Sequence, residues 1–277
     1  YHTQTTNTRA HMKQSASCGA TTRRELNGRH FLYRLPSHSS CTTSSQSLPL
    51  LILIHCYGCT APMEIGKYSA AADALGFALA APEGIGRSFN APHCCGEAKL
   101  RRVDDVGFVD AIVSELLVSE HTDQGGPRFL ASALFASGFS NGGFLTSHLA
   151  DKSKHAWAGI APTAGHEYYL SRTTPLPISM HHCANDLAVN SSGCCMAPAA
   201  ANGPFFSGAV EGGLQPTCCC EIVAKSCVST HSLFDRWLTV NQCNKFVASR
   251  IVPAHKSQIP DAICTAGVNC AAETMLC

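Results

Sequence analysis

The segment LPLLILIH, residues 48–55, is an uninterrupted apolar run of strand length. Such a run is typical of a β-strand buried on both faces, as in parallel sheets with helices on either side. Strand-like and helix-like segments alternate along the chain, which favours a mainly parallel sheet covered by helices on both faces. Strands are predicted at 30–36, 48–55, 77–82, 133–137, 156–165 and 176–182, and helices at 64–75, 104–120, 141–150 and 229–243.

The chain is expected to form one folded domain. Residues 1–20 are polar, rich in Thr, Ser and Gln and without hydrophobic periodicity, so we expect a flexible N-terminal segment. Residues 21–277 contain no linker and no internal repeat, which predicts a single α/β domain. The longest aliphatic run, Leu50–Ile54, is too short to span a bilayer. The formal net charge is +1 and the basic residues are scattered, so nucleic-acid binding is not indicated. The sequence does not indicate an oligomeric state.

The stretch Gly138-Phe139-Ser140-Asn141-Gly142 fits the pattern G-x-S-x-G. In this pattern the glycines permit a sharp turn from strand to helix, which lifts the serine oxygen above the carboxyl edge of the sheet. A serine there also lies at a helix N-terminus, where developing negative charge is favoured. The pattern alone is weak in a chain rich in Gly and Ser, and Ser140 could belong to an ordinary turn. The predicted strand before it and helix after it favour a nucleophile.

A serine nucleophile needs N–H donors for the oxyanion that forms on its substrate. One candidate is the backbone N–H of Asn141, directly after the serine. The second is expected in the loop that follows the buried strand 48–55, where the N–H of Cys56 or Tyr57 is the candidate. We interpret His55, at the end of that strand, as a packed and hydrogen-bonded histidine rather than a base.

The remaining members of a catalytic triad are an acid and a histidine. Asp186 follows the predicted strand 176–182 and a short turn, where the acid is expected, although an Asn-Asp pair is also common in surface turns. Only His231 and His255 follow Asp186 in the sequence. His231 begins a predicted helix and suits a surface or capping role. His255, in a polar loop, is therefore the candidate base within the chain, although it too could be an ordinary loop residue.

Taken together, these motifs resemble the secreted α/β-hydrolases of the polyhydroxybutyrate depolymerase and feruloyl esterase group. The resemblance covers roughly residues 26–277 and implies an α/β-hydrolase fold, a serine esterase with Ser140 as nucleophile and Asp186 as acid, and no cofactor or metal. In that group the position of Cys56 is usually Gly, so Cys56 is a departure that could crowd the oxyanion loop or be tied to another cysteine. The segments that carry the resemblance are HCYGCTA (55–61), FNAPHCCG (89–96), VDDVGFVDAIV (103–113), ASGFSNGGF (136–144) and HCANDLAVN (182–190).

The same resemblance makes residues 264–277 the final pair of strands and places the catalytic histidine a few residues further on. We therefore expect the sequence to be truncated at its C-terminus, with His255 serving as the base if it is not. A catalytically inactive binding protein on a hydrolase fold, lacking the triad histidine, is the alternative to an enzyme.

The chain contains 17 cysteines, several of them adjacent to one another. This number favours disulfides and hence an oxidising compartment, so we expect a secreted protein. Neighbouring Cα atoms across a trans peptide lie about 3.8 Å apart, too close for an unstrained disulfide, so the cysteines of each doublet are expected to pair with distant partners. A metal site around His181, His182 and Cys183 is the rival interpretation.

The sequence constrains the substrate only loosely. Tyr168 and Tyr169 follow a predicted strand at the active edge of the sheet and could line a pocket for a phenolic acyl group. They favour hydroxycinnamate (feruloyl) esters of plant cell-wall polysaccharide slightly over a polyhydroxybutyrate-type polyester.

Overall fold

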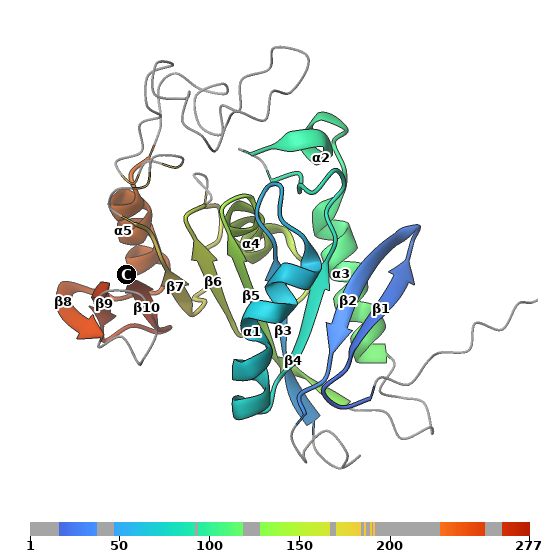
Figure 1. Ribbon diagram of the computed structural model, residues 1–277. Helices are drawn as coiled ribbons and strands as arrows, with labels where there is room; N and C mark the ends of the chain where they lie inside the picture. The colour runs from blue at the N-terminus through green and yellow to red at the C-terminus, as the bar shows by residue number, and fades with distance from the viewer. Residues whose placement is uncertain are drawn as a thin grey trace, which may run out of the picture.

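The computed structural model describes residues 17–37, 47–91, 94–118, 128–166, 170–183, 186, 189, 191, 228–252 and 262–277. Its strands form a ten-stranded sheet in the order β1-β2-β4-β3-β5-β6-β7-β10-β9-β8 (Figure 1). The strands are β1 (Thr21–Leu26), β2 (Arg29–Arg34), β3 (Ser47–Ile54), β4 (Ala78–Pro82), β5 (Arg128–Phe139), β6 (Gly159–Thr163), β7 (Ile178–Met180), β8 (Asn244–Val252), β9 (Ala262–Val268) and β10 (Thr274–Leu276). The helices are α1 (Ala61–Leu75), α2 (Gly96–Leu100), α3 (Asp105–Val118), α4 (Asn141–Lys152) and α5 (Thr230–Val240).

The centre of the sheet is parallel and its two edges are antiparallel. Strands β4, β3, β5, β6, β7 and β10 pair in parallel, whereas β1 and β2 join β4 at one edge and β9 and β8 join β10 at the other in antiparallel fashion. The predicted α/β-hydrolase fold class, with a mainly parallel sheet, is confirmed. Because parallel strands share one direction, the loops after β3, β4, β5, β6 and β7 all leave from the same edge.

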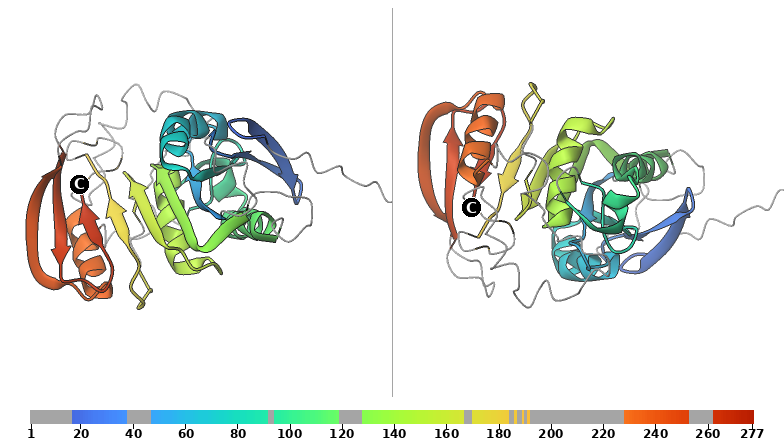
Figure 2. Two further views of the ribbon diagram at one scale, coloured as in Figure 1. Left: turned by 90° about the horizontal axis from the view of Figure 1, so that it is seen from below. Right: turned by 90° about the horizontal axis from the view of Figure 1, so that it is seen from above.

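Helices cover both faces of the sheet, as the alternation of elements predicts. Helix α1 lies on one face, and α3, α4 and α5 lie on the other (Figure 2). Helix α1 ends where Gly76 takes the left-handed conformation at φ 74°, and the Gly76 N–H donates to the carbonyl of Ala72. Helix α3 buries Val109, Val113 and Leu116, which lie on one helical face because they are spaced three or four residues apart.

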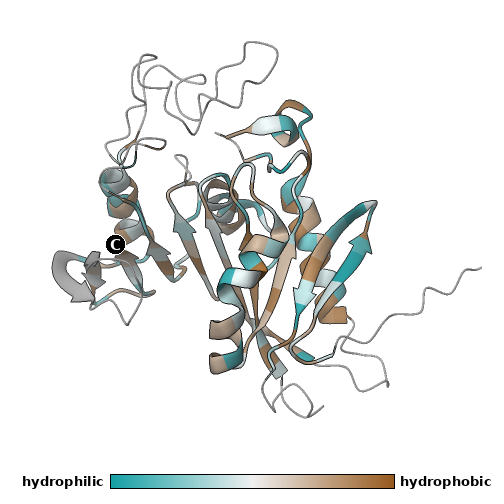
Figure 3. Ribbon diagram, viewed as in Figure 1, coloured by the Kyte–Doolittle hydropathy of each residue, from teal (hydrophilic) through white to brown (hydrophobic). Residues whose placement is uncertain are grey.

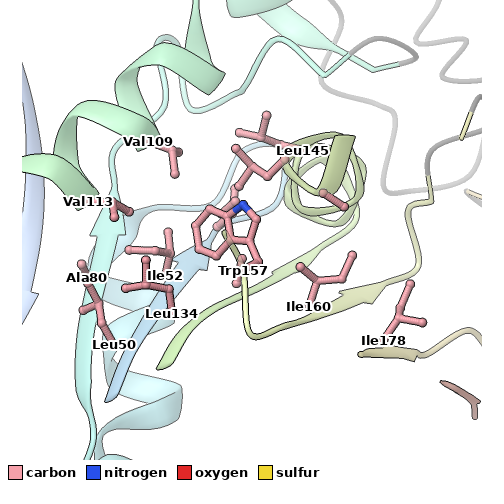
Figure 4. Close-up of a cluster of buried hydrophobic side chains, with 14 of the residues drawn as sticks. Leu50, Ile52, Ala80, Val109, Val113, Leu134, Leu145, Trp157, Ile160 and Ile178 are labelled. Atoms are coloured by element: carbon pink, nitrogen blue, oxygen red, sulfur yellow. The ribbon is translucent and has the colours of Figure 1, made fainter. Parts of the chain in front are cut away.

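The core is largest between the sheet and α3, α4 and α5. The apolar residues of the central strands lie next to those of α3 and α4, around the indole of Trp157 (Figure 4). Colouring by hydropathy shows apolar stretches along the central strands and on the helices beside them (Figure 3). A second, smaller core lies under α1 and includes Ile65, Ala72 and Leu79. Strand β4 and the C-terminal half of β3 are therefore buried on both faces, as the apolar run at 48–55 predicts for β3.

One part of the α1 face is open. An apolar groove of about 1330 Å³ runs from Tyr68 and Leu75 of α1 across β5 and β6 to His182 near the end of β7. Phe135 of β5 lines it and remains 37% exposed. The groove follows one face of the sheet and ends at the edge from which the loops leave.

Disulfides join several described cysteines. The pairs are Cys56–Cys59, Cys94–Cys95, Cys243–Cys270 and Cys264–Cys277, and Cys18 is also disulfide-bonded. Cys94 pairs with its neighbour across a cis peptide, at a Cα–Cα distance of 3.1 Å. The prediction of distant partners is therefore wrong for this doublet: its two cysteines bond to each other although their Cα atoms lie closer than in most disulfides.

Among the described residues, no helix combines the length and the apolar character needed to cross a bilayer. The described residues also contain no group of three or more His, Cys, Asp and Glu residues arranged to hold a metal ion. The residues around His181, His182 and Cys183 are therefore not assembled as a metal site within this part of the chain.

Candidate active site

Ser140 occupies the turn between β5 and α4. Its backbone has φ 55° and ψ −118°, a conformation that costs a residue with a side chain of the order of 1–3 kcal/mol. Two hydrogen bonds hold it: its N–H donates to the carbonyl of Thr163 at 2.8 Å, and its own carbonyl accepts the N–H of Phe144 at 3.0 Å. The side chain is partly exposed at the edge from which the loops leave.

The glycines around Ser140 are required by close packing. A Cβ on Gly138 would lie 2.3 Å from the carbonyl oxygen of Gly142, and a Cβ on Gly142 would lie 2.0 Å from the carbonyl oxygen of Ile54. Neither position can hold a side chain without moving backbone. The first turn of α4 is thereby brought against the end of β3, next to the loop in which the second oxyanion donor is predicted.

That loop, residues 55–60, is a tight turn closed by a disulfide. Cys56 bonds to Cys59, so this departure from the resembled group is tied to another cysteine, one of the two possibilities raised by the sequence. The N–H of Cys59 donates to the carbonyl of Cys56 at 3.1 Å, and the N–H of Gly58 donates to the carbonyl of Arg87 at 2.8 Å. The N–H groups of Cys56 and Tyr57 make no hydrogen bond within the described part of the chain.

Asn141 combines a free backbone donor with a fully used side chain. Its N–H lies in the first turn of the twelve-residue helix α4 and makes no hydrogen bond within the described residues. Its buried side-chain amide binds the main chain of Phe89 twice: Oδ1 accepts the Phe89 N–H at 2.7 Å, and Nδ2 donates to the Phe89 carbonyl at 3.0 Å. The residue thus fixes the loop after β4 while its own N–H stays available to an oxyanion.

His55 is a packed and hydrogen-bonded residue, as we interpret it from the sequence. It is fully buried, and its ring packs against Phe89 with 4.5 Å between centroids. The N–H of Gly84 donates to Nε2 at 3.0 Å, so Nδ1 carries the proton and donates to the carbonyl of Cys56 at 2.8 Å. Burial lowers the pKa of His55 below its usual range, which keeps the ring neutral. Both nitrogens are engaged and the ring is not placed to act as a base.

Asp186 lies beyond β7, where the sequence predicts the triad acid. Its Oδ1 accepts the Val189 N–H at 2.9 Å, and its Oδ2 lies 3.8 Å from Nε2 of His182. Nε2 of His182 donates instead to the carbonyl of Val189 at 2.6 Å. The carboxylate is thus held at the edge of the sheet that also carries Ser140.

A buried histidine that the sequence does not single out lies next to this edge. His166 follows Gly165, at which a Cβ would lie 2.2 Å from the carbonyl oxygen of Ser140. Its Nε2 hydrogen-bonds Nδ1 of His182 at 3.1 Å, and its Nδ1 is buried without a partner in the described residues. Burial, followed by the charges of His182 and His181, lowers the pKa of His166 to about 3. The Gly-His pair directly after an apolar strand is the signal that could have identified it.

Three of the predicted site residues fall outside the structural description. His255, the predicted base, and the predicted pocket residues Tyr168 and Tyr169 lie outside the described residues. The structure brings together Ser140, Asn141, Cys56 and Tyr57, and it places Asp186 at the same edge of the sheet.

Comparison with known proteins finds a relative in sequence. The chain is 33% identical over 150 residues to the protein named "Putative esterase NocK" from Nocardia uniformis subsp. tsuyamanensis. The match covers 52% of this chain and 41% of that protein, so the chain spans about two fifths of the length of this relative. No family model matches the chain.

Solved structures with partial similarity include esterases. A thermostable esterase overlaps 62% of this chain and 48% of its own at 15% identity and a TM-score of 0.44. A phospholipase/carboxylesterase from Dyadobacter fermentans overlaps 60% and 78% at 17% identity and a TM-score of 0.41. A ferulic acid esterase overlaps 53% and 59% at 15% identity and a TM-score of 0.37. Overlaps of this extent say nothing about the substrate of this chain.

Proposed function

We propose that the chain is a serine hydrolase that cleaves carboxylic esters through an acyl-enzyme. The observation that carries the proposal is the turn at Ser140, held at φ 55° between glycines that have no room for a side chain. Backbone strain of this kind persists where the surrounding structure enforces it and is concentrated at functional sites. The N–H groups of Asn141, Cys56 and Tyr57 beside it, which have no hydrogen-bond partner in the described part of the chain, support the same interpretation.

In the proposed reaction the Ser140 hydroxyl attacks the ester carbonyl and its proton passes to a histidine. The N–H of Asn141, with that of Cys56 or Tyr57, stabilises the oxyanion of the tetrahedral intermediate. The histidine then protonates the departing alcohol, which leaves an acyl group on Ser140. Water attacks this acyl-enzyme in the second half of the cycle and releases the carboxylic acid. The carboxylate of Asp186 orients the histidine and stabilises its imidazolium form.

Two histidines of the chain are candidates for the base. His255 is the candidate that follows the acid in sequence. His166 lies one residue from the Gly165 that abuts Ser140, and its Nδ1 has no partner within the described residues, but burial lowers its pKa to about 3 and weakens it as a base. The variants His255→Gln and His166→Gln distinguish them, because loss of a triad base lowers kcat by several powers of ten.

The finer proposal concerns substrate and location. We propose a secreted enzyme that acts on feruloyl esters of plant cell-wall polysaccharide or on a polyhydroxybutyrate-type polyester. The disulfides among the described cysteines support an oxidising compartment. The likeness to the named esterase supports an ester substrate but no particular acyl group.

Hydrolysis of p-nitrophenyl acetate, methyl ferulate and a 3-hydroxybutyrate oligomer, each with Ser140→Ala as control, tests the proposal. Turnover that depends on Ser140 is the expected result, and the preferred ester separates the two substrate classes. Background rates on all three substrates with a folded protein would instead favour the non-catalytic binding protein.

A further inference from the structure

The carbonyl of Cys56 is held by two donors at once. Nδ1 of His55 donates to it at 2.8 Å, and the N–H of Cys59 donates to it at 3.1 Å. The disulfide between Cys56 and Cys59 closes the same turn covalently, with 5.1 Å between the two Cα atoms. The orientation of this carbonyl is therefore fixed by a buried imidazole, a backbone donor and a covalent link.

The same peptide unit carries the N–H of Tyr57. A trans peptide is planar, so its C=O and N–H point in opposite directions. Fixing the carbonyl of Cys56 toward His55 and Cys59 consequently aims the Tyr57 N–H away from them. That N–H has no hydrogen-bond partner within the described residues, although the neighbouring Gly58 N–H is used by the carbonyl of Arg87.

His55 is connected through Phe89 to Asn141, the other proposed oxyanion donor. Its ring packs on Phe89, and the main chain of Phe89 is bound at both its N–H and its carbonyl by the side chain of Asn141. A continuous set of contacts therefore runs from Asn141 through Phe89 and His55 to the Cys56–Tyr57 peptide.

We infer that His55 and the Cys56–Cys59 disulfide are positioning elements that hold the Tyr57 N–H as the second oxyanion donor. The inference rests on the proposed ester hydrolysis at Ser140. It selects Tyr57 over Cys56 and gives the cysteines of this loop a role in the rate of the reaction.

Two substitutions at His55 separate this role from packing. An Asn side chain places an amide N–H where Nδ1 lies and keeps a donor for the Cys56 carbonyl. A Gln side chain reaches the position of Nε2 and loses that donor. We expect His55→Gln to lower kcat on p-nitrophenyl acetate roughly 10- to 100-fold with little change in KM, because misplacing an oxyanion donor acts on the transition state. His55→Asn is expected to retain most of kcat.

The disulfide has a matched control in Cys243–Cys270, which lies next to β8 and β9 at the far edge of the sheet. We expect Cys56→Ser/Cys59→Ser to lower kcat about tenfold or more, and Cys243→Ser/Cys270→Ser to lower only the melting temperature. Equal kcat in the two double variants, or equal losses in His55→Gln and His55→Asn, would overturn the inference while Ser140-dependent turnover of the unaltered chain stands. Absence of that turnover would remove the proposed function and this inference with it.

Discussion

Nε2 of His166 lies 3.1 Å from Nδ1 of His182, and the hydrogen bond between them joins the loop after β6 to the loop after β7. Nε2 of His182 donates to the carbonyl of Val189, so in its neutral form its Nδ1 accepts the proton of His166. Burial lowers the pKa of His166 to about 3 and keeps its ring neutral, so its Nδ1 is unprotonated, and this nitrogen is buried and unpartnered within the described residues. A proton added to this pair would place a positive charge where water cannot hydrate it.

The first prediction concerns acid stability. The pKa of His166 is about 3 in the folded protein and near 6.5 in an unfolded chain, so between these pH values the unfolded chain binds the additional proton. The free energy of unfolding contributed by His166 is therefore fully present above pH 6.5 and declines as the pH falls toward 3, by up to about 1.4 kcal/mol per pH unit.

Urea unfolding of the wild type and of His166→Leu between pH 7 and pH 4 measures this contribution. His55 and His181, whose pKa values are also lowered by burial, remain in both proteins and cancel from the comparison. We expect a shallower pH dependence in the variant. Parallel curves would contradict the burial of a neutral His166.

The second prediction tests the turn at Ser140. Gly142→Ala puts a methyl group 2.0 Å from the carbonyl oxygen of Ile54, so β3 and α4 must move apart. We expect a loss of at least about 2–3 kcal/mol in the free energy of unfolding, together with loss of esterase activity. Gly66→Ala is the matched control, since Gly66 lies exposed in α1 with no atom within 4 Å of its ideal Cβ. It should gain about 0.5–1 kcal/mol.

The third prediction compares two buried asparagines that make the same kind of contact. Asn141 binds the N–H and carbonyl of Phe89, and Asn241 binds the N–H and carbonyl of Leu176. Replacing either by Ala leaves buried backbone groups unpaired and should cost about 2–3 kcal/mol. Only Asn141→Ala is expected to lower kcat, because Phe89 supports the oxyanion loop. Similar kcat losses in both variants would indicate a general loss of structure instead.

Sequence reasoning located the central elements because burial on both faces leaves a strong apolar signal. The predicted strands at 48–55 and 77–82 correspond to β3 and β4 within one residue at each end, and the predicted helix at 64–75 begins three residues late. The edge strands β1 and β8 were not predicted. They carry charged residues without clear alternation, and pairing with a neighbour determines their structure. The Asn27-Gly28 pair, with φ 52° and 74°, was an available hairpin signal for β1 and β2.

The candidate site also has parts that the local sequence predicts and parts that only the tertiary fold brings together. Ser140 and its glycines form a local motif, so the sequence alone predicts the turn that the structure contains. The contact between His166 and His182 depends on the parallel placement of β6 beside β7, and no spacing along the chain encodes it. The Cys56–Cys59 pair lies between these cases: its spacing permits a bridge, but many other partners were available among 17 cysteines.

The last prediction uses two neighbouring residues of β5 that point to opposite faces of the sheet. Leu134 is 1% exposed in the main core, whereas Phe135 is 37% exposed and lines the groove on the α1 face. Leu134→Ala removes buried contacts and leaves a cavity, so we expect a loss of about 2–5 kcal/mol in the free energy of unfolding.

Phe135→Ala removes the larger side chain but from a surface that is already partly in water, so the expected loss is below about 1.5 kcal/mol. Chemical denaturation of both variants at one pH gives the comparison. If Phe135→Ala proved as costly as Leu134→Ala, Phe135 would have to be buried in solution. That result would contradict the open groove over β5 and β6.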